Sequence, residues 1–275
     1  MPRAAGGGVR VSVVIPAYNA EDTIEQCIRS VKRQGVDVEI IVADNYSTDG
    51  TAEKARRLGA KVLPRSGRPG NPASARNAGL SVAKGEYVLF LDSDEVLGEG
   101  VLKDCLKLAN EMEIGMVKIP IVFVGSTFWS RCSAFWKNTH YRVCKKTLGN
   151  VPRFFCRRLL GERPFDEELP CKEDWDLYER MRRRGVSEAY SRAAMYHLEP
   201  KTLGEMTAKN LRYSKALLDL SRRGRGPLAT IFRQFLRTSV EALRRPPKNP
   251  LILAGCLILI LINAQLMLLR KITPK

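Results

Sequence analysis

The chain has 275 residues, of which 44% are hydrophobic and 27% are charged, and its formal net charge is +17. This length suits one large α/β domain with an appendage, and the composition excludes a low-complexity protein. The positive charge indicates an anionic partner, such as a phosphorylated substrate or an acidic membrane surface. No RNA- or DNA-binding motif accompanies the charge, and aromatic residues are not interleaved with it, so we expect no nucleic-acid partner.

The basic residues are concentrated towards the C-terminus. Residues 201–250 contain twelve Lys or Arg residues against three Asp or Glu residues. The seven cysteines include no Cys-x-x-Cys pair and the histidines are not clustered, so we expect reduced thiols and no zinc site. Residues 1–8 lack the apolar stretch of a signal peptide, and we expect them to form a short disordered lead.

The first part of the chain alternates apolar blocks with helical patterns. The apolar blocks predict buried strands over residues 9–15, 38–43, 61–63 and 86–91. Helical spacing and capping residues predict helices over residues 20–34, 52–58 and 73–83. Strands that are apolar on both faces and alternate with helices are typical of a parallel sheet with crossover connections. We therefore expect an α/β fold with a Rossmann-like, mostly parallel sheet flanked by helices.

The pattern is less regular after residue 100. Helices are predicted over residues 101–113, 173–184 and 202–220, and strand-like patterns over 116–124 and 154–160. Between residues 125 and 150 the chain is aromatic and basic, without a clear period.

Polar side chains follow three of the predicted strands. They form the clusters Ala17-Tyr18-Asn19, Asp44-Asn45 and Asp92-Ser93-Asp94. Ligands of parallel α/β sheets bind beyond the carboxyl ends of the strands, so we expect the clusters to converge at one edge. Residues two apart in a strand point the same way, which lets Asp92 and Asp94 meet one small ion. Two hard oxygen ligands suit Mg²⁺ or Mn²⁺ shared with substrate phosphates, although Asp-x-Asp is also common in solvated turns.

Two patterns near the C-terminus predict membrane contact. Apolar residues between 228 and 243 follow helical spacing among arginines, which is typical of an amphipathic helix that lies on an anionic membrane. The alternative is an amphipathic helix packed on a core. Residues 251–269 carry no formal charge, which predicts a transmembrane helix. A buried core helix or a re-entrant helix would produce the same pattern.

Six short motifs occur in the order typical of one enzyme family. They are Val13-Val-Ile-Pro-Ala-Tyr-Asn19, Ile41-Val-Ala-Asp44-Asn-Tyr-Ser-Thr-Asp49-Gly50, Ala75-Arg-Asn-Ala-Gly79, Phe90-Leu-Asp92-Ser-Asp94, Phe165-Asp-Glu167 and Glu173-Asp174-Trp175. With these motifs, residues 9–200 resemble glycosyltransferase family 2, the inverting nucleotide-sugar transferases of the type A fold. The basic segment and apolar tail resemble the layout of dolichyl- and polyprenyl-phosphate sugar synthases.

The resemblance implies a site for a UDP- or GDP-linked sugar at the strand ends. Asp44 would accept a hydrogen bond from the base, and the forked guanidinium of Arg76 would lie near the donor phosphates. The residues implied on this donor side are Pro16, Ala17, Tyr18, Asn19, Asp44, Asn45, Arg76, Asp92 and Ser93. The implied cofactor is Mn²⁺ or Mg²⁺, held by Asp92, Asp94 and His197, and it would neutralise charge on the leaving nucleotide.

The resemblance also implies an acceptor side. Asp174 would be the general base that takes a proton from the acceptor hydroxyl, while an anionic lipid phosphate would only need to be oriented by it. Acidic residues that open a helix also complement the helix dipole, which is the alternative reading. The other acceptor-side candidates are Arg153, Arg157, Glu173 and Trp175.

Two departures bear on the substrate. Glu162-Arg-Pro164 stands where the family often has Gly-Gly before Phe-Asp-Glu. The chain also lacks the Gln-x-x-Arg-Trp motif of processive synthases, so we expect transfer of a single sugar.

The sequence thus predicts a membrane-anchored, metal-dependent, inverting glycosyltransferase with a polyprenyl-phosphate or lipid-linked acceptor. Basic residues before the apolar tail favour a catalytic domain at the cytoplasmic face. The predicted segments are a lead (1–8), a catalytic domain (9–200), basic juxtamembrane helices (201–248) and a membrane helix (249–270). The alternatives are the same chemistry on a polysaccharide or soluble acceptor, a nucleotidyltransferase, and a non-catalytic nucleotide-binding membrane protein.

Overall fold

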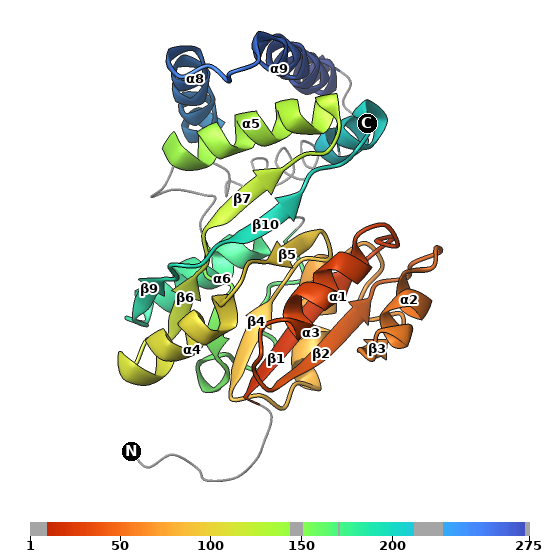
Figure 1. Cartoon of the computed structure of the whole chain (residues 1–275), viewed down its shortest axis with the longest axis vertical. Coiled ribbons are helices and arrows are strands. Elements are labelled where there is room, and N and C mark those ends of the chain that lie inside the picture. The colour runs from red at the N-terminus through yellow and green to blue at the C-terminus, as the bar shows by residue number, and fades with distance from the viewer. Residues whose placement is uncertain (1–9, 144–150, 170, 212–227, 273–275) are drawn as a thin grey trace. The chain divides into compact units, whose positions relative to one another are not determined.

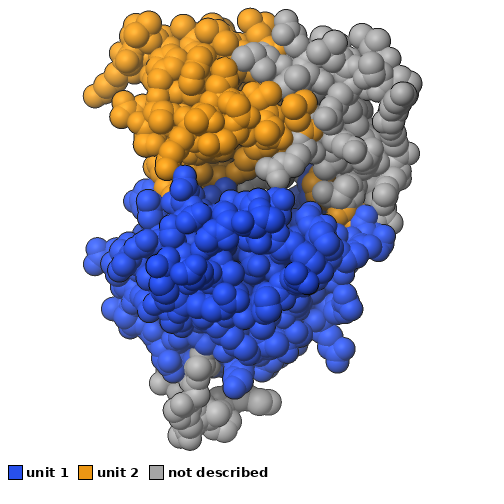
Figure 2. Space-filling model, turned by 90° about the vertical axis from the view of Figure 1, so that its right-hand side faces the viewer, with its two compact units in different colours: residues 1–121, 151–168, 172–196 blue, residues 122–150, 169–171, 197–275 orange. Residues whose placement is uncertain are grey.

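The computed structural model describes residues 10–143, 151–169, 171–211 and 228–272. The chain forms two compact units, shown in blue and orange in Figure 2. Unit 1 consists of residues 1–121, 151–168 and 172–196, and unit 2 of residues 122–150, 169–171 and 197–275. Residues 122–150, which the sequence places with the catalytic domain, therefore belong to unit 2. The predicted disordered lead, residues 1–8, lies outside the described residues.

Unit 1 contains a seven-stranded sheet of order β3-β2-β1-β4-β8-β6-β9 (Figure 1). The strands are β1 (Val11–Ala17), β2 (Val38–Asp44), β3 (Lys61–Leu63), β4 (Tyr87–Phe90), β6 (Met116–Lys118), β8 (Phe154–Cys156) and β9 (Glu188–Tyr190). The first four strands are parallel neighbours, and β8 runs antiparallel between β4 and β6. This arrangement confirms the predicted α/β class with a mostly parallel sheet.

Helices cover both faces of the sheet in unit 1. They are α1 (Ile24–Lys32), α2 (Thr51–Arg57), α3 (Pro72–Ser81), α4 (Val101–Glu111) and α6 (Glu173–Arg183). Val13 and Ile15 of β1 pack in the core that contains α1 and α4, whereas the intervening Val14 packs in the core that contains α3 and α6. Burial on alternating sides explains why consecutive residues such as Val13, Val14 and Ile15 are all apolar.

The position of Gly79 allows α3 to pack closely on β1. A Cβ atom added at Gly79 would overlap Cγ1 of Val14, which is fully buried. We expect Gly79→Ala to lower the free energy of unfolding by about 1–3 kcal/mol through overpacking, measured by urea denaturation. Gly161→Ala is the matched control, because among the described residues no atom lies within 4 Å of its added Cβ. Equal stability of the two variants would contradict this account of the α3 packing.

Two segments differ from the predicted elements. The strand expected over 116–124 is two strands, β6 and β7 (Ile121–Val124), with Pro120 between them. Proline has no N–H for a strand ladder, which accounts for the break. The strand expected over 154–160 ends at Cys156 and continues as a 3-10 turn over Arg157–Leu159. A smaller sheet has the order β5 (Glu95–Leu97), β10 (Met195–Leu198), β7.

Unit 2 is mainly helical. Figure 1 shows α8 (Leu228–Arg244) and α9 (Pro250–Ile272) above α5 (Phe128–Val143), and both contact α5. Residues 203–211 are also helical. The sequence did not predict α5, because its buried residues are mostly small or polar and produce no apolar period: Ser130, Cys132, Ala134 and Thr139.

Helix α9 covers the segment for which the sequence predicts a transmembrane helix, residues 251–269. Within the described parts of the chain, no helix has both the length and the apolar character that crossing a membrane requires. The predicted transmembrane helix is therefore not found.

Candidate active site

The parallel strands bring the three polar clusters of the sequence to one edge of the sheet. Ala17 at the end of β1 is in register with Asp44 at the end of β2. Phe90, the last residue of β4, is in register with Val14, and Asp92 follows two residues later. Because parallel strands end on the same side, the three clusters lie beyond one set of carboxyl ends, as predicted.

The loops that follow β1 and β2 are joined by hydrogen bonds. Asn19 adopts a left-handed backbone conformation with φ of 46°, which asparagine tolerates better than most residues. The Thr48 N–H donates to Asn19 Oδ1 at 2.8 Å, and the Asn19 N–H donates to Ser47 Oγ at 3.0 Å. The Glu21 N–H donates to Asp49 Oδ2 at 3.1 Å. Asn19 therefore shapes the loop that presents the half-exposed Tyr18.

Asp44 is buried at the end of β2 with one oxygen that the protein does not satisfy. Its side chain is 5% exposed, and among the described residues no donor reaches its Oδ1. A buried acceptor without a donor is costly, and a ligand that supplies an N–H would remove that cost. The contact predicted between Asp44 and a nucleotide base is therefore chemically well matched to this structure.

The side chain of Asn45 makes hydrogen bonds to a neighbouring loop. Its amide group donates to the carbonyl oxygens of Ser66 at 2.6 Å and Arg68 at 2.8 Å. Its Oδ1 accepts from the Gly70 N–H at 2.6 Å. These bonds hold the loop after β3 against the end of β2.

Arg76 connects Asp92 with the start of α6. Its Nη2 donates to Asp92 Oδ1 at 2.7 Å, and its Nη1 forms an ion pair with Glu173 Oε1. Burial disfavours the charge on Arg76, but Asp92 and Glu173 raise the pKa of its guanidinium above the ordinary value. Arg76 is thus a fixed cation that connects the Asp92-Ser93-Asp94 motif with the Glu173-Asp174-Trp175 motif.

Arg153 is a second buried cation in the same cluster. Its Nη1 lies 3.3 Å from Asp92 Oδ2, and its Nη2 lies 3.3 Å from Glu95 Oε1. Burial raises the pKa of Glu95, and Arg153 opposes this effect. The sequence predicted Arg153 on the acceptor side, whereas the structure places it directly on Asp92.

Glu95 belongs to the same cluster, although the sequence did not predict it as a site residue. Its Oε2 accepts from the Asp92 N–H at 2.9 Å, and its side chain is fully buried. The available signal was the third acid of the run Asp92-Ser93-Asp94-Glu95. This position lets Glu95 fix both the backbone of Asp92 and the orientation of Arg153.

The Glu173-Asp174-Trp175 motif opens helix α6. Asp174 is half-buried in the first turn, and its Oδ1 accepts from the Trp175 N–H at 2.7 Å. The charge of Asp174 contributes to the high pKa of both Arg76 and Arg153. Asp174 therefore interacts electrostatically with the cluster around Asp92, and the neighbouring Trp175 is half-buried.

Arg157 is not brought into this cluster. The Nε of Arg157 donates to the carbonyl oxygen of Gly85 at 2.7 Å, beside the start of β4, whereas Asp92 follows its end. His197 belongs to unit 2, where its Nδ1 lies 3.6 Å from Glu199 Oε1. In the described part of the chain, no group of three or more His, Cys, Asp and Glu side chains is placed to hold a metal.

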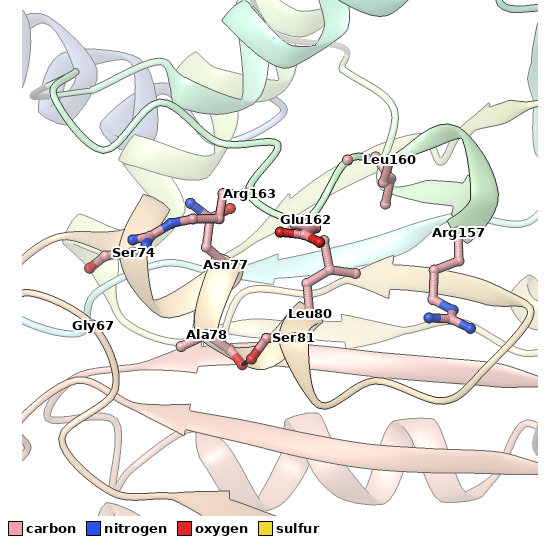
Figure 3. Close-up of a pocket in the computed structure, with 11 residues that line it drawn as sticks. Gly67, Ser74, Asn77, Ala78, Leu80, Ser81, Arg157, Leu160, Glu162 and Arg163 are labelled. Atoms are coloured by element: carbon pink, nitrogen blue, oxygen red, sulfur yellow. Dashed lines mark hydrogen bonds between the residues drawn. The ribbon is translucent and has the colours of Figure 1, made fainter.

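Arg157 instead lines a pocket of about 620 Å³ (Figure 3). Ser74, Asn77 and Ser81 line it from α3, on the side of the helix away from Arg76. The pocket is thus a separate hollow from the cluster around Asp92.

Comparisons with known proteins agree with this geometry. A family model described as glycosyl transferase family 2 matches residues 12–168, which is more than half of the chain. The chain belongs to glycosyltransferase family 2. This membership confirms the predicted enzyme class, a glycosyltransferase.

Several curated proteins are similar to parts of the chain. A poly(ribitol-phosphate) β-glucosyltransferase of Bacillus spizizenii is 38% identical over 102 residues, covering 34% of this chain and 16% of that protein. The minor teichoic acid biosynthesis protein GgaB of Bacillus subtilis is 25% identical over 219 residues, covering 74% of this chain and 24% of that protein. The chain thus matches less than two fifths of the length of these curated relatives.

Solved structures of glycosyltransferases share the fold. Staphylococcus aureus TarS, residues 1–349, has a TM-score of 0.53 at 23% identity, covering 90% of this chain and 70% of that chain. The mannosyltransferase PcManGT of Pyrobaculum calidifontis, in complex with GDP-Man and Mn²⁺, has a TM-score of 0.56 at 19% identity, covering 97% and 76%. At these identities the likeness establishes the fold alone.

Proposed function

We propose that this protein is an inverting, metal-dependent glycosyltransferase that moves one sugar from a nucleotide sugar to an acceptor. The observation that carries the proposal is the contact of Arg76 with both Asp92 and Glu173. Arg76 connects the Asp92-Ser93-Asp94 motif, which would face the donor, with the Glu173-Asp174-Trp175 motif, which carries the candidate base. A sugar-transfer site needs these two functions next to each other, because leaving group and nucleophile meet at one carbon.

The donor in this proposal is a UDP- or GDP-linked sugar. The open oxygen of Asp44 suits an N–H of uracil or guanine. Tyr18, which follows the strand residue in register with Asp44, is exposed. Solved relatives support both nucleotides, since TarS was solved with UDP and with UDP-GlcNAc, and PcManGT with GDP-Man.

A divalent cation fits the carboxylates at the end of β4. Asp92 and Asp94 would hold it, and both side chains remain partly exposed, so phosphate oxygens and water can complete the ligand set. Mn²⁺ in the PcManGT complex supports this cofactor. When bound, the ion would supply positive charge to the departing nucleoside diphosphate.

The chain's own residues supply the remaining chemistry. Arg76 and Arg153 hold Asp92 in one orientation and keep two positive charges beside the donor side. Asp174 would take the proton of the acceptor hydroxyl as that oxygen attacks the anomeric carbon from the face opposite the nucleotide, which inverts the configuration. With a lipid phosphate as acceptor, the attacking oxygen is already anionic and Asp174 would orient it.

For the acceptor we propose a polyprenyl phosphate or a lipid-linked glycan at the cytoplasmic face of a membrane. The basic C-terminal region supports an anionic membrane partner. The second candidate is a polymer acceptor, which is favoured by the names of the teichoic acid and poly(ribitol-phosphate) relatives. Mass spectrometry of products formed with a polyprenyl phosphate or with poly(ribitol phosphate) tests the two acceptors.

We expect Asp94→Ala to abolish the stabilisation of the protein by nucleotide plus Mn²⁺. Asp94 is partly exposed beyond β4, so its loss removes a metal ligand without opening a core cavity. The measurement is the shift in Tm with UDP or GDP, with and without Mn²⁺. Asp104→Ala is a control for loss of a carboxylate elsewhere in unit 1, where Asp104 accepts from Ser191 Oγ. A metal-dependent shift that survives in Asp94→Ala would remove Asp94 from the proposed metal site.

A further inference from the structure

Helix α8 turns polar and small residues inwards. Gln234, Thr238 and Ala242, spaced by four, are all buried. Thr238 Oγ1 lies 2.9 Å from His140 Nδ1 of α5, which fixes the orientation of the helix. A hydrogen bond therefore holds the inward face of α8 against α5. The helix does not need all of its apolar residues for packing in unit 2.

The opposite side of α8 exposes large apolar side chains. Leu236 and Val240 are each 48% exposed and Leu243 is 59% exposed. Their spacing of four and three places them on one stripe of the helix. This is the reverse of a helix packed on a core, where such a stripe faces inwards.

Helix α9 shows the same arrangement. Gly255 and Cys256 face α5, where Cys256 Sγ lies 3.0 Å from the carbonyl oxygen of Cys132. A Cβ atom added at Gly255 would overlap Cys132 Sγ, so the helix approaches α5 closely. Its outward residues are apolar and 46–64% exposed: Leu251, Leu257, Ile258 and Leu261.

Together these seven residues form what we call the apolar face of unit 2. It consists of Leu236, Val240, Leu243, Leu251, Leu257, Ile258 and Leu261. Both helices contact α5, and Figure 1 draws both of them above it. Soluble monomers rarely expose so many large apolar side chains together, and such patches mark interaction sites.

A basic stripe runs beside the apolar face. Arg233, Arg237 and Arg244 are exposed on α8 at spacings of four and seven, adjacent to the apolar stripe. Arg245 is also exposed and pairs with Glu241 at 3.1 Å. Guanidinium groups on long stems next to leucines match a surface that is apolar inside and anionic at its edge.

We propose that the apolar face and the arginine stripe dock α8 and α9 flat on an anionic lipid bilayer. The apolar side chains enter the acyl boundary, and the arginines contact lipid phosphates. Helices that lie in the plane need only one apolar face and do not have to span the bilayer. A second copy of this chain fits the surface less well, because it would bring a second set of arginines to the same interface. The proposal rests on the membrane location proposed above and specifies its surface.

The test is flotation of the full-length chain with lipid vesicles. We expect the wild type to float with vesicles of phosphatidylcholine and phosphatidylglycerol, and to bind phosphatidylcholine alone much more weakly. The triple variant Leu236→Gln, Val240→Gln, Leu243→Gln should lose about tenfold or more in vesicle affinity. Met112→Gln is the matched control, because Met112 is 63% exposed in unit 1 and lies outside the apolar face.

A second variant tests the charge. Arg233→Gln, Arg237→Gln, Arg244→Gln should weaken binding to the anionic vesicles and reduce its dependence on salt. The docking surface would be overturned by wild-type protein that does not bind anionic vesicles, or by triple variants that bind as tightly as the wild type. A concentration-dependent dimer that the leucine variant dissolves would assign the face to a second copy instead.

Nucleotide-induced Tm shifts are measured on the same proteins. They should be unchanged in both triple variants, since neither touches the donor site. Vesicle binding without any nucleotide response would overturn the proposed function and leave the docking surface standing. A nucleotide response without vesicle binding would overturn the docking surface and leave the proposed nucleotide-sugar site standing.

Discussion

Asp174→Asn should stop sugar transfer and leave donor binding intact, with kcat reduced about 10²–10⁴-fold. An amide keeps the shape of the side chain and the hydrogen bond from the Trp175 N–H, but it cannot accept a proton from an acceptor hydroxyl. The measurement is the initial rate of transfer at saturating donor, together with the Tm shift produced by the nucleotide. Nucleotide binding should match that of the wild type, because Asp174 lies on α6, whereas the residues proposed to bind the donor lie on α3 and at the ends of β1, β2 and β4.

The matched control for this variant is Asp176→Asn. Asp176 lies in the same first turn of α6 but pairs with Arg180 at 2.8 Å on the surface. We expect this control to keep transfer near the wild-type rate. If Asp174→Asn weakened donor binding as strongly as transfer, the assignment of Asp174 to the acceptor side would be wrong.

Arg76→Met should have the largest effect on stability, lowering the free energy of unfolding by about 3–5 kcal/mol. The side chains of Arg76 and Glu173 are only 6% and 8% exposed, so the change leaves a buried carboxylate without its cation. Asp92 loses one of its two guanidinium partners but keeps Arg153. Urea denaturation followed by circular dichroism measures the loss.

Two further variants separate charge from packing at Arg76. The double variant Arg76→Met, Glu173→Gln should recover part of the lost stability, because the second change removes the unpaired charge. Arg29→Met is the control, since the Arg29–Glu25 pair is exposed on α1 and contributes about 1 kcal/mol or less. If Arg76→Met lowered the free energy of unfolding no more than Arg29→Met does, the buried ion pairs of Arg76 would not be holding α6 to the site.

The central sheet could be predicted from the sequence because its strands are buried on both faces. The apolar blocks that became β1, β2 and β4 stand out from the helices between them, and Lys61–Leu63 was predicted with the observed bounds. Helix α5 could not be predicted in the same way, since close packing selected small buried residues such as Ser130 and Ala134. The apolar pattern of residues 251–269 correctly predicted a helix. It did not predict that one face of α9 packs on α5.

The candidate site, too, could be predicted only in part from the sequence. The convergence of Asp44 and Asp92 followed from parallel strands that end at one edge. The contact of Arg76 with Glu173 joins residues 97 positions apart, and no local pattern predicts such a contact. Arg153 and Arg157 differ by four positions, but they flank β8, which runs antiparallel to β4. Arg153 therefore lies beside Phe90 at the end of β4 and reaches Asp92, whereas Arg157 lies beside Glu86 before the start of β4.

The most direct test of the central claim, a metal-dependent nucleotide-sugar site, is a panel of Tm measurements on the purified chain. UDP, GDP and their common sugar conjugates are each added with and without Mn²⁺. We predict that one nucleotide series raises Tm, that the increase requires Mn²⁺, and that Asp94→Ala removes it. A folded protein whose Tm responds to no nucleotide, with or without the metal, would contradict the proposed function.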